Sequence, residues 1–205
     1  MSELINTAVL VSGGGTNLQA IIDAKKAGLL PHVNLAVVLS SQADAYALTR
    51  AKKAAVPAFA VEQDAYASQE AFEAALREKL DAYGIELIVL AGFLCILSEE
   101  FTKRYERRII NIHPSLIPSF CGAGFYGLKV HEAALAKGVK ISGATVHFVN
   151  EIPDGGEIIA QKAVRVYPGD TPEKLQKRIM RQAEWKLLPA ATEQVAKEIL
   201  EEKKR

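Results

Sequence analysis

The sequence is poor in residues that form disulfides and metal sites. Only two cysteines and four histidines occur among 205 residues, and they form neither a C-x-x-C pair nor an H-E-x-x-H motif. Two cysteines fit a reducing compartment better than a secreted, disulfide-stabilised protein. We therefore expect no metal site and a cytoplasmic location.

The sequence also lacks an excess of charge of either sign and a long apolar run. Lysine and arginine number 25 against 24 aspartates and glutamates, for a formal net charge of +1. A charge so near zero provides no attraction for nucleic acids or acidic membranes. The longest apolar stretch, residues 87–97, is shorter than the roughly 18 residues that cross a bilayer. We expect neither a nucleic acid nor a membrane as partner.

Apolar residues make up 49% of the chain, and in the first half they alternate between strand and helix patterns. Residues 7–12 read TAVLVS, a β-branched run typical of a buried parallel strand. Further strands are expected at residues 33–39, 58–61, 87–91 and 108–112. Amphipathic segments separate them, and this β-α-β-α order predicts an α/β fold with a doubly wound, mostly parallel sheet.

The second half departs from this order. Residues 114–127 hold two prolines and three glycines, which predicts a long irregular loop of the kind that is often functional; residues 121–127 are a candidate lid. Two strands at residues 142–149 and 157–166 are expected to be antiparallel additions to the sheet. A last helix begins at Thr171, and we expect Pro189 to break it.

A glycine-rich loop, Ser12-Gly13-Gly14-Gly15-Thr16-Asn17, joins the first expected strand to the first helix. Ligands bind at this edge of open α/β sheets, and N–H groups at a helix N-terminus favour anions. The dinucleotide fingerprint fits poorly, because Leu18 stands where its third glycine would be. A monophosphate is therefore favoured over NAD. The alternative is a turn that needs glycine only for its positive φ angle.

Asn111 and His113 end a central strand, directly before the long loop. Side chains two residues apart on a strand point to the same side, so both can reach one bound molecule. Asp154-Gly155-Gly156 lies between two expected strands, where an Asp-Gly pair is an ordinary turn signal. The sequence does not determine whether Asp154 meets His113. If it does, the carboxylate would raise the pKa of the imidazole and orient it.

The other candidates have structural interpretations. We expect His147 to be a core or rim histidine, His131 to be exposed, and Cys95 to be a small buried residue. Glu184 and Gln69 are expected on solvated helix faces.

Five segments in chain order resemble the folate formyltransferase superfamily. They are Ser12-Gly-Gly-Gly-Thr-Asn, Val89-Leu-Ala-Gly-Phe-Leu, Asn111-Ile-His-Pro-Ser-Leu-Ile-Pro, Gly143-Ala-Thr-Val-His-Phe-Val and Asp154-Gly-Gly. The glycine loop is similar to that of its phosphoribosylglycinamide formyltransferase branch. The resemblance covers nearly the whole chain. It implies one formyltransferase domain over residues 1–205 and formyl transfer from 10-formyltetrahydrofolate to the amine of 5′-phosphoribosylglycinamide, a step of purine biosynthesis.

The resemblance also implies roles for individual residues. The catalytic residues would be Asn111, His113 and Asp154. The ribonucleotide would bind Gly15, Thr16, Asn17 and Glu184, mostly in the half formed by residues 1–110. The folate would bind Leu94, Cys95, Ile96, Leu97, Asn111 and Gln69, and residues 111–205 would form the catalytic and folate-binding half. Family members often carry arginine at the position of Cys95, and some carry a basic residue at that of Gln69.

The implied chemistry needs no metal and no tightly bound cofactor, since the folate is a co-substrate. Asn111 and His113 would donate hydrogen bonds to the oxyanion of a tetrahedral intermediate. Asp154 would hold His113 protonated and help to move the proton. Only small-molecule substrates are expected as partners, and a homodimer is left open.

Three other functions agree less well with the sequence. Formyltetrahydrofolate deformylase and methionyl-tRNA formyltransferase share the Asn-x-His block, but they resemble longer chains with an added N-terminal or C-terminal domain. Here the first strand begins near residue 7 and nothing follows the last helix, so both fit poorly. A nucleotide-binding module without catalysis would leave Asn111 and His113 unexplained.

Overall fold

The computed structural model describes residues 4–204. Within them one seven-stranded sheet has the order β3-β2-β1-β4-β5-β6-β7. The strands are β1 (Ile5–Val11), β2 (Val33–Ser40), β3 (Ala58–Ala60), β4 (Leu87–Leu90), β5 (Ile109–His113), β6 (Ile141–Phe148) and β7 (Ile158–Arg165). The first five are parallel, and β6 is antiparallel to both of its neighbours, β5 and β7. The predicted fold class is confirmed.

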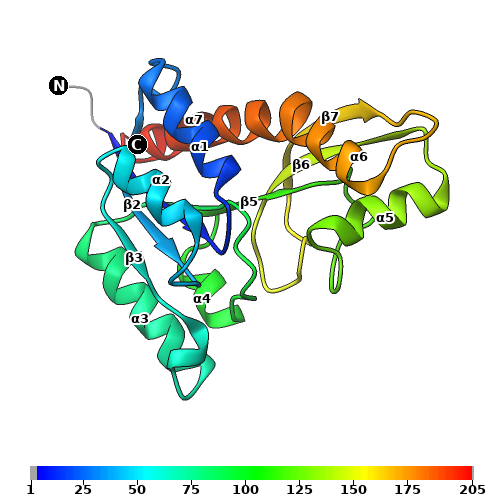
Figure 1. Ribbon diagram of the computed structural model, residues 1–205. Helices are drawn as coiled ribbons and strands as arrows, with labels where there is room; N and C mark the ends of the chain where they lie inside the picture. Colours follow the sequence, from blue (N-terminus) through cyan, green and yellow to red (C-terminus); the bar gives the residue numbers. More distant parts are fainter. Residues whose placement is uncertain (1–3, 205) are drawn as a thin grey trace.

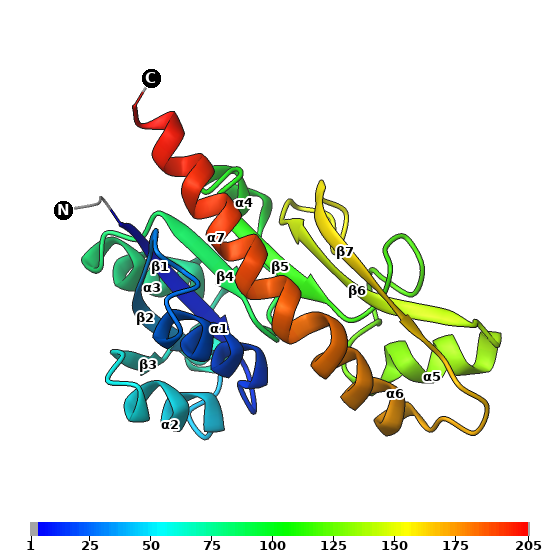
Figure 2. The same ribbon diagram turned by 90° about the horizontal axis from the view of Figure 1, so that it is seen from above.

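Helices cover both faces of the sheet (Figure 1). They are α1 (Thr16–Lys26), α2 (Tyr46–Lys53), α3 (Gln69–Ala82), α4 (Glu99–Arg104), α5 (Leu128–Lys137), α6 (Pro172–Ile179) and α7 (Trp185–Glu202), with a 3₁₀ turn, η1 (Gln63–Ala65), before α3. The apolar sides of α1, α6 and α7 form one core cluster, and those of α3 and α4 form the other. Figure 2 shows α7 crossing one face of the sheet, where it contacts β1, β2, β6 and β7.

Local sequence fixes where several helices begin. Ser68, Ser98 and Thr171 precede α3, α4 and α6, and each hydroxyl accepts a hydrogen bond from the backbone N–H three residues later. Such caps satisfy a backbone donor that has no partner within the helix. The sheet order reverses between β1 and β4. The loops that follow these two strands therefore diverge at the carboxyl edge and leave room for a ligand.

Pro189 does not break the last helix, so that prediction was wrong. α7 runs through Pro189, and the irregular turn precedes α7, in the π-helical segment η2 (Met180–Glu184). A proline ring inside a helix contacts the carbonyl four residues earlier, here that of Trp185. The ψ angle of Trp185 is −6°, whereas α-helices have about −42°. This rotation turns the carbonyl from its helical direction and accommodates the proline.

Among residues 4–204, no helix combines the length and apolar character that crossing a membrane requires. In the same part of the chain, no group of three or more histidine, cysteine, aspartate or glutamate side chains is placed to hold a metal ion.

Candidate active site

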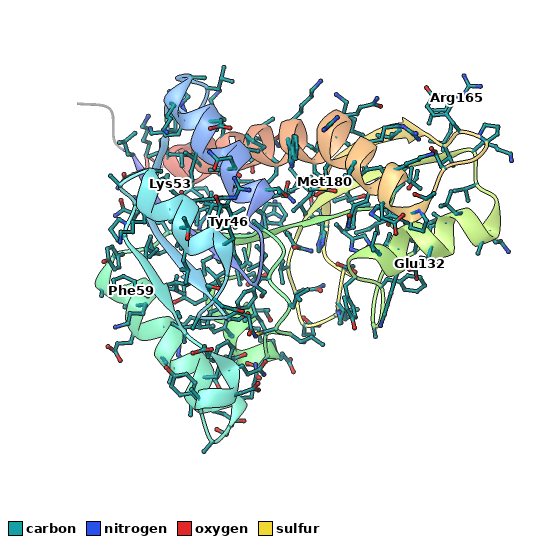
Figure 3. All side chains as sticks on the ribbon, in the orientation of Figure 1. Tyr46, Lys53, Phe59, Glu132, Arg165 and Met180 are labelled. Carbon is teal, nitrogen blue, oxygen red and sulfur yellow. The ribbon has the colours of Figure 1, made fainter. Side chains whose placement is uncertain are left out.

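A cavity of about 680 Å³ lies at the carboxyl edge of the sheet. The loops after β4, β5 and β6 form its walls, and α6 and η2 close one side. Met180 of η2, labelled in Figure 3, belongs to this lining. The predicted site residues that line the cavity are Asn17, Leu94, Cys95, Ile96, Leu97, Asn111, His113, Asp154 and Glu184. Gly15, Thr16 and Gln69 lie outside the lining.

The Asp154 carboxylate is the centre of the polar cluster. Its Oδ2 lies 3.3 Å from Nδ1 of His113 and accepts a hydrogen bond of 2.9 Å from the N–H of Gly122. Its Oδ1 lies 3.5 Å from both Nδ2 of Asn111 and Nε2 of His147. Asp154 therefore does meet His113, a contact that the sequence left undetermined.

The backbone places these groups. Asn111 and His113 are on β5, and Asn111 pairs with His147 on β6. Asp154 has a φ of +56°, a left-handed conformation that aspartate tolerates better than most residues. A Cβ atom at Gly156 would lie 1.8 Å from the Phe148 carbonyl oxygen, so only glycine fits there. Asp-Gly-Gly is thus a tight turn and also part of the site.

Both ring nitrogens of His113 lie close to an acceptor oxygen, Nδ1 to Asp154 at 3.3 Å and Nε2 to the Phe120 carbonyl. The Phe120 carbonyl, 2.9 Å away, can only accept, so Nε2 carries a proton. Burial lowers the pKa of His113, and this effect outweighs the Asp154 carboxylate and the Phe120 carbonyl, which both favour the protonated form. Asp154 does act to raise the pKa of His113, as expected, but burial of this residue, which is only 4% exposed, makes the net shift downward. The hydrogen bond to the Phe120 carbonyl orients the ring.

Asp154 stays ionised in spite of its position. Burial alone would raise the pKa of its carboxyl group, but the hydrogen bonds from His147 and the Gly122 N–H, together with the charges of His113 and His147, bring the pKa below its usual value. The cluster thus combines a carboxylate with a mainly neutral imidazole at pH 7.

His147 was interpreted only as a core or rim histidine. It is buried, as expected, but it also lines the cavity. Its Nδ1–H donates to the Phe148 carbonyl at 2.7 Å, and its Nε2 lies 3.2 Å from Nδ2 of Asn111. Pairing β5 against β6 in antiparallel register would have revealed this neighbour from the sequence.

His131 on α5 is fully buried, so the prediction that it is exposed was wrong. Neither ring nitrogen has a hydrogen-bond partner within the described residues, and the ring lines the cavity. Burial lowers the pKa of His131 to about 4, and the nearby His113 acts in the same direction. The signal was present in the helical spacing, because His131 and the buried Ala134 lie three residues apart on one face.

Asn17 and Glu184 join the glycine loop to the start of α7. Nδ2 of Asn17 donates to Oε2 of Glu184 at 2.7 Å. Glu184 is 6% exposed, so the expected solvated face was wrong; the η2 turn directs it inward. Burial raises the pKa of Glu184 to about 7, against the hydrogen bond from Asn17.

The glycine loop is shaped by its contacts with α2. Gly15 has a φ of +69°, and a Cβ atom there would lie 2.6 Å from Cβ of Ala47. A Cβ atom at Gly13 or Gly14 would meet nothing within 4 Å in the described structure, so the space above them is open. Arg50, which the sequence reasoning missed, donates from Nε to the Gly14 carbonyl at 2.8 Å.

The segment after β4 presents both backbone and apolar side chains to the cavity. Leu94 is 64% and Ile96 is 66% exposed, whereas Leu97 is buried. Cys95, expected to be buried, is half-buried: it packs against the core cluster of α3 and α4 and also lines the cavity. Gln69 is also half-buried, because its side chain bonds to the backbone of this segment instead of facing solvent.

Comparisons with known proteins agree on one family. The family model described as "Formyl transferase" matches residues 5–192. The phosphoribosylglycinamide formyltransferase of Haemophilus influenzae is 41% identical over 182 residues, which are 89% of this chain and 82% of that protein. The crystal structure of glycinamide ribonucleotide transformylase 1 from Symbiobacterium toebii has a TM-score of 0.89 and 44% identity, and the match covers 97% of this chain and 90% of that one.

The chain also matches part of a much longer relative. The trifunctional purine biosynthetic protein adenosine-3 of Gallus gallus is 42% identical over 192 residues, which are 94% of this chain but 18% of that protein. The family model and the Haemophilus relative both cover most of the present chain. The chain therefore belongs to the formyl transferase family.

Proposed function

We propose that this protein transfers a formyl group from 10-formyltetrahydrofolate to the amine of 5′-phosphoribosylglycinamide, in purine biosynthesis. The observation that carries the proposal is the cluster of Asn111, His113 and Asp154 inside one cavity. The names of the relatives support the choice of substrates. The protein is accordingly a folate-dependent formyltransferase.

The ribonucleotide binds at the N-terminus of α1. Its phosphate lies over Gly13 and Gly14, where the space is open and no acidic residue occupies the first helical turn. Oδ1 of Asn17 is buried and has no hydrogen-bond partner in residues 4–204, which leaves it to accept from a ribose hydroxyl. Glu184, bonded to the same side chain, provides a second polar contact to the ribose.

The folate binds along residues 94–97, the cavity wall that presents the exposed side chains of Leu94 and Ile96. An apolar wall with a few polar groups suits a flat heterocycle with donors and acceptors at its edge. Asn111 extends from β5 toward the same cavity and reaches the formyl group.

The reaction is an acyl transfer between two nitrogens. The amine attacks the formyl carbon, and the carbonyl oxygen gains a negative charge that Nδ2 of Asn111 and Nε2 of His113 stabilise as donors. The attacking nitrogen loses a proton to Asp154, directly or through water, and Asp154 returns this proton to folate N10 as the C–N10 bond breaks. No net proton is gained or lost, and His147 keeps the amide of Asn111 in place.

A spectrophotometric assay tests the proposal. The protein is mixed with the dideaza analogue of 10-formyltetrahydrofolate, with and without phosphoribosylglycinamide. We expect deformylation that depends on the ribonucleotide. Loss of the formyl group without the acceptor would indicate a deformylase instead, and no loss under either condition would indicate a binding module.

The broader assignments are proposals of the same kind. Residues 1–110 form the ribonucleotide half and residues 111–205 the catalytic and folate half; residues 1–3 and 205 lie outside the described structure. Cys95 and Cys121 are free thiols, as a reducing cytoplasm allows. The partners are the two small-molecule substrates.

A further inference from the structure

Two side chains of α3 hold the backbone of the cavity wall after β4. Gln69 and Glu73 are four residues apart, on one side of the helix. Nε2 of Gln69 donates to Oε1 of Glu73 at 2.8 Å and to the carbonyl of Ile96 at 2.9 Å. The amide therefore connects the helix to the segment that lines the cavity.

Glu73 fixes the next part of the same segment. Its carboxylate is 2% exposed. Oε1 accepts from the backbone N–H of Ser98 at 2.6 Å, and Oε2 accepts from the hydroxyl of Ser98 at 2.5 Å. Charge-assisted bonds of this kind are the strong ones in proteins. Residues 96 and 98 are thus held on either side of the buried Leu97.

The side chain of Gln69 has no N–H donor left for a carboxylate ligand. Its Nε2 donates twice, and its Oε1 accepts from Nε2 of Gln63 at 2.7 Å. Gln69 also lies outside the cavity lining, whereas Ile96 belongs to it. These contacts argue against direct binding of the folate, for example of its glutamate tail, by the side chain of Gln69, the role that the family resemblance implies for this residue.

We propose that Gln69 and Glu73 are positioning residues for the folate: they hold the Ile96 carbonyl and the Ser98 N–H, and so preset the backbone of residues 94–97 to which the pterin binds. The inference rests on the proposed function. α3 itself does not need the pair, because Ser68 caps it and Phe72, Leu76 and Leu80 bury its apolar face. The role of the pair is thus separable from folding of the helix.

The test compares two folate substrates in the variants Gln69→Ala and Glu73→Gln. One substrate is the dideaza analogue of 10-formyltetrahydrofolate, and the other is the matching pteroate analogue, which lacks the glutamate tail. We expect KM for both substrates to rise by the same factor, about tenfold, the effect of losing one or two hydrogen bonds. The kcat and the KM for the ribonucleotide should stay within about twofold of the unmodified protein.

A matched control is available on α7. Gln194 makes the same kind of bond to Glu198 four residues later, at 2.9 Å, but on an exposed surface. Gln194→Ala should leave kcat and the KM values for both folate substrates and for the ribonucleotide unchanged. A rise in KM confined to the substrate with the tail would overturn the proposal in favour of direct contact with the tail. Unchanged KM for both substrates would overturn it as well.

Binding measured by calorimetry separates this proposal from the proposed reaction. The dissociation constant of a dideaza folate without a formyl group is measured for the unmodified protein and for Gln69→Ala, and it needs no turnover. Weaker binding in the variant would support the positioning role even if no formyl transfer is detected. If Glu73→Gln does not fold, the test rests on Gln69→Ala, because Gln69 is only half-buried. If the unmodified protein does not bind the folate, the proposal is overturned.

Discussion

The two walls of the cavity are held in place by different kinds of groups. The first, which we call the scaffold wall, consists of residues 12–17 and 92–98 and is fastened by side chains that take no part in the proposed chemistry. For example, Ser12 Oγ accepts from the N–H of Leu94 at 2.9 Å. The second, the loop wall of residues 114–127, is fastened in its first part by Thr145 and Gln161. Its later part is fastened by the proposed catalytic groups, since His113 holds the Phe120 carbonyl and Asp154 holds the Gly122 N–H.

This difference separates binding from catalysis. Changes to the catalytic groups should leave the scaffold wall intact, so substrates should still bind to it. The same changes should loosen the loop wall, because its attachment and the chemistry share two side chains. The following experiments test whether binding and catalysis are separated in this way.

The largest effect is expected from Asp154→Asn. The amide keeps the shape of the carboxylate but loses its charge and its ability to take up a proton, so kcat should fall about 10³-fold. The dissociation constant of a dideaza folate, measured by calorimetry, should change less than about twofold. Unchanged turnover would remove Asp154 from the mechanism.

Asn111→Ala should have the next largest effect. It removes a donor to the developing oxyanion and should lower kcat about 10²-fold, as for other such donors. Single-turnover kinetics with saturating substrates measure the chemical step directly. A rise in KM alone would mean that Asn111 contributes to ground-state binding and not to the transition state.

Glu184, which braces the scaffold wall through Asn17, should make stability fall as pH rises. Its pKa in the folded protein, about 7, lies above the usual value of 4.5, so the folded state binds the proton more tightly. Stability is then lost as pH rises from about 4.5 through 7, by about 2 kcal/mol. The free energy of unfolding in urea should differ less between pH 5 and pH 8 for Glu184→Gln than for the unmodified protein. An equal difference in both proteins would contradict the assignment of this pH dependence to Glu184.

His131, beside the loop wall, should have the opposite dependence. Its folded-state pKa of about 4 lies below the usual 6.5, so the unfolded state binds more protons between these values. Stability should fall by about 2 kcal/mol as pH decreases from 7 to 5. His131→Leu removes this titration while filling a similar volume. Its free energy of unfolding should depend less on pH in this window; an unchanged dependence would assign the acid sensitivity to other groups.

The smallest effect is expected in limited proteolysis. Residues 121–127 should be cut more slowly when a folate analogue is bound, and faster in Asp154→Asn, whose uncharged amide oxygen is a weaker acceptor for the Gly122 N–H than the carboxylate. Mass spectrometry of the fragments locates the cleavage. Equal rates in all three samples would argue against a lid and against the attachment of the loop wall through Asp154.

The sequence predicted those features that depend on local periodicity. Strand alternation placed Asn111 and His113 on one side, and serine and threonine marked the helix starts. The meeting of Asp154 with His113 depends on the path of β6 and its turn, which no local pattern specifies. The burial of His131 and the inward direction of Glu184 depend on how α5 and η2 pack, so polar residue type alone gave the wrong answer at both positions.

The bond between His113 and the Phe120 carbonyl has a consequence for the energetics of the reaction. The Nε2–H of His113 donates to the Phe120 carbonyl, so in the proposed mechanism a formyl oxygen would exchange places with a carbonyl of similar acceptor strength and gain little. An alkoxide-like oxygen is a much stronger acceptor than an amide carbonyl. The exchange therefore becomes favourable only as negative charge accumulates, and the loop that occupies the donor makes its hydrogen bond selective for the intermediate over the bound folate.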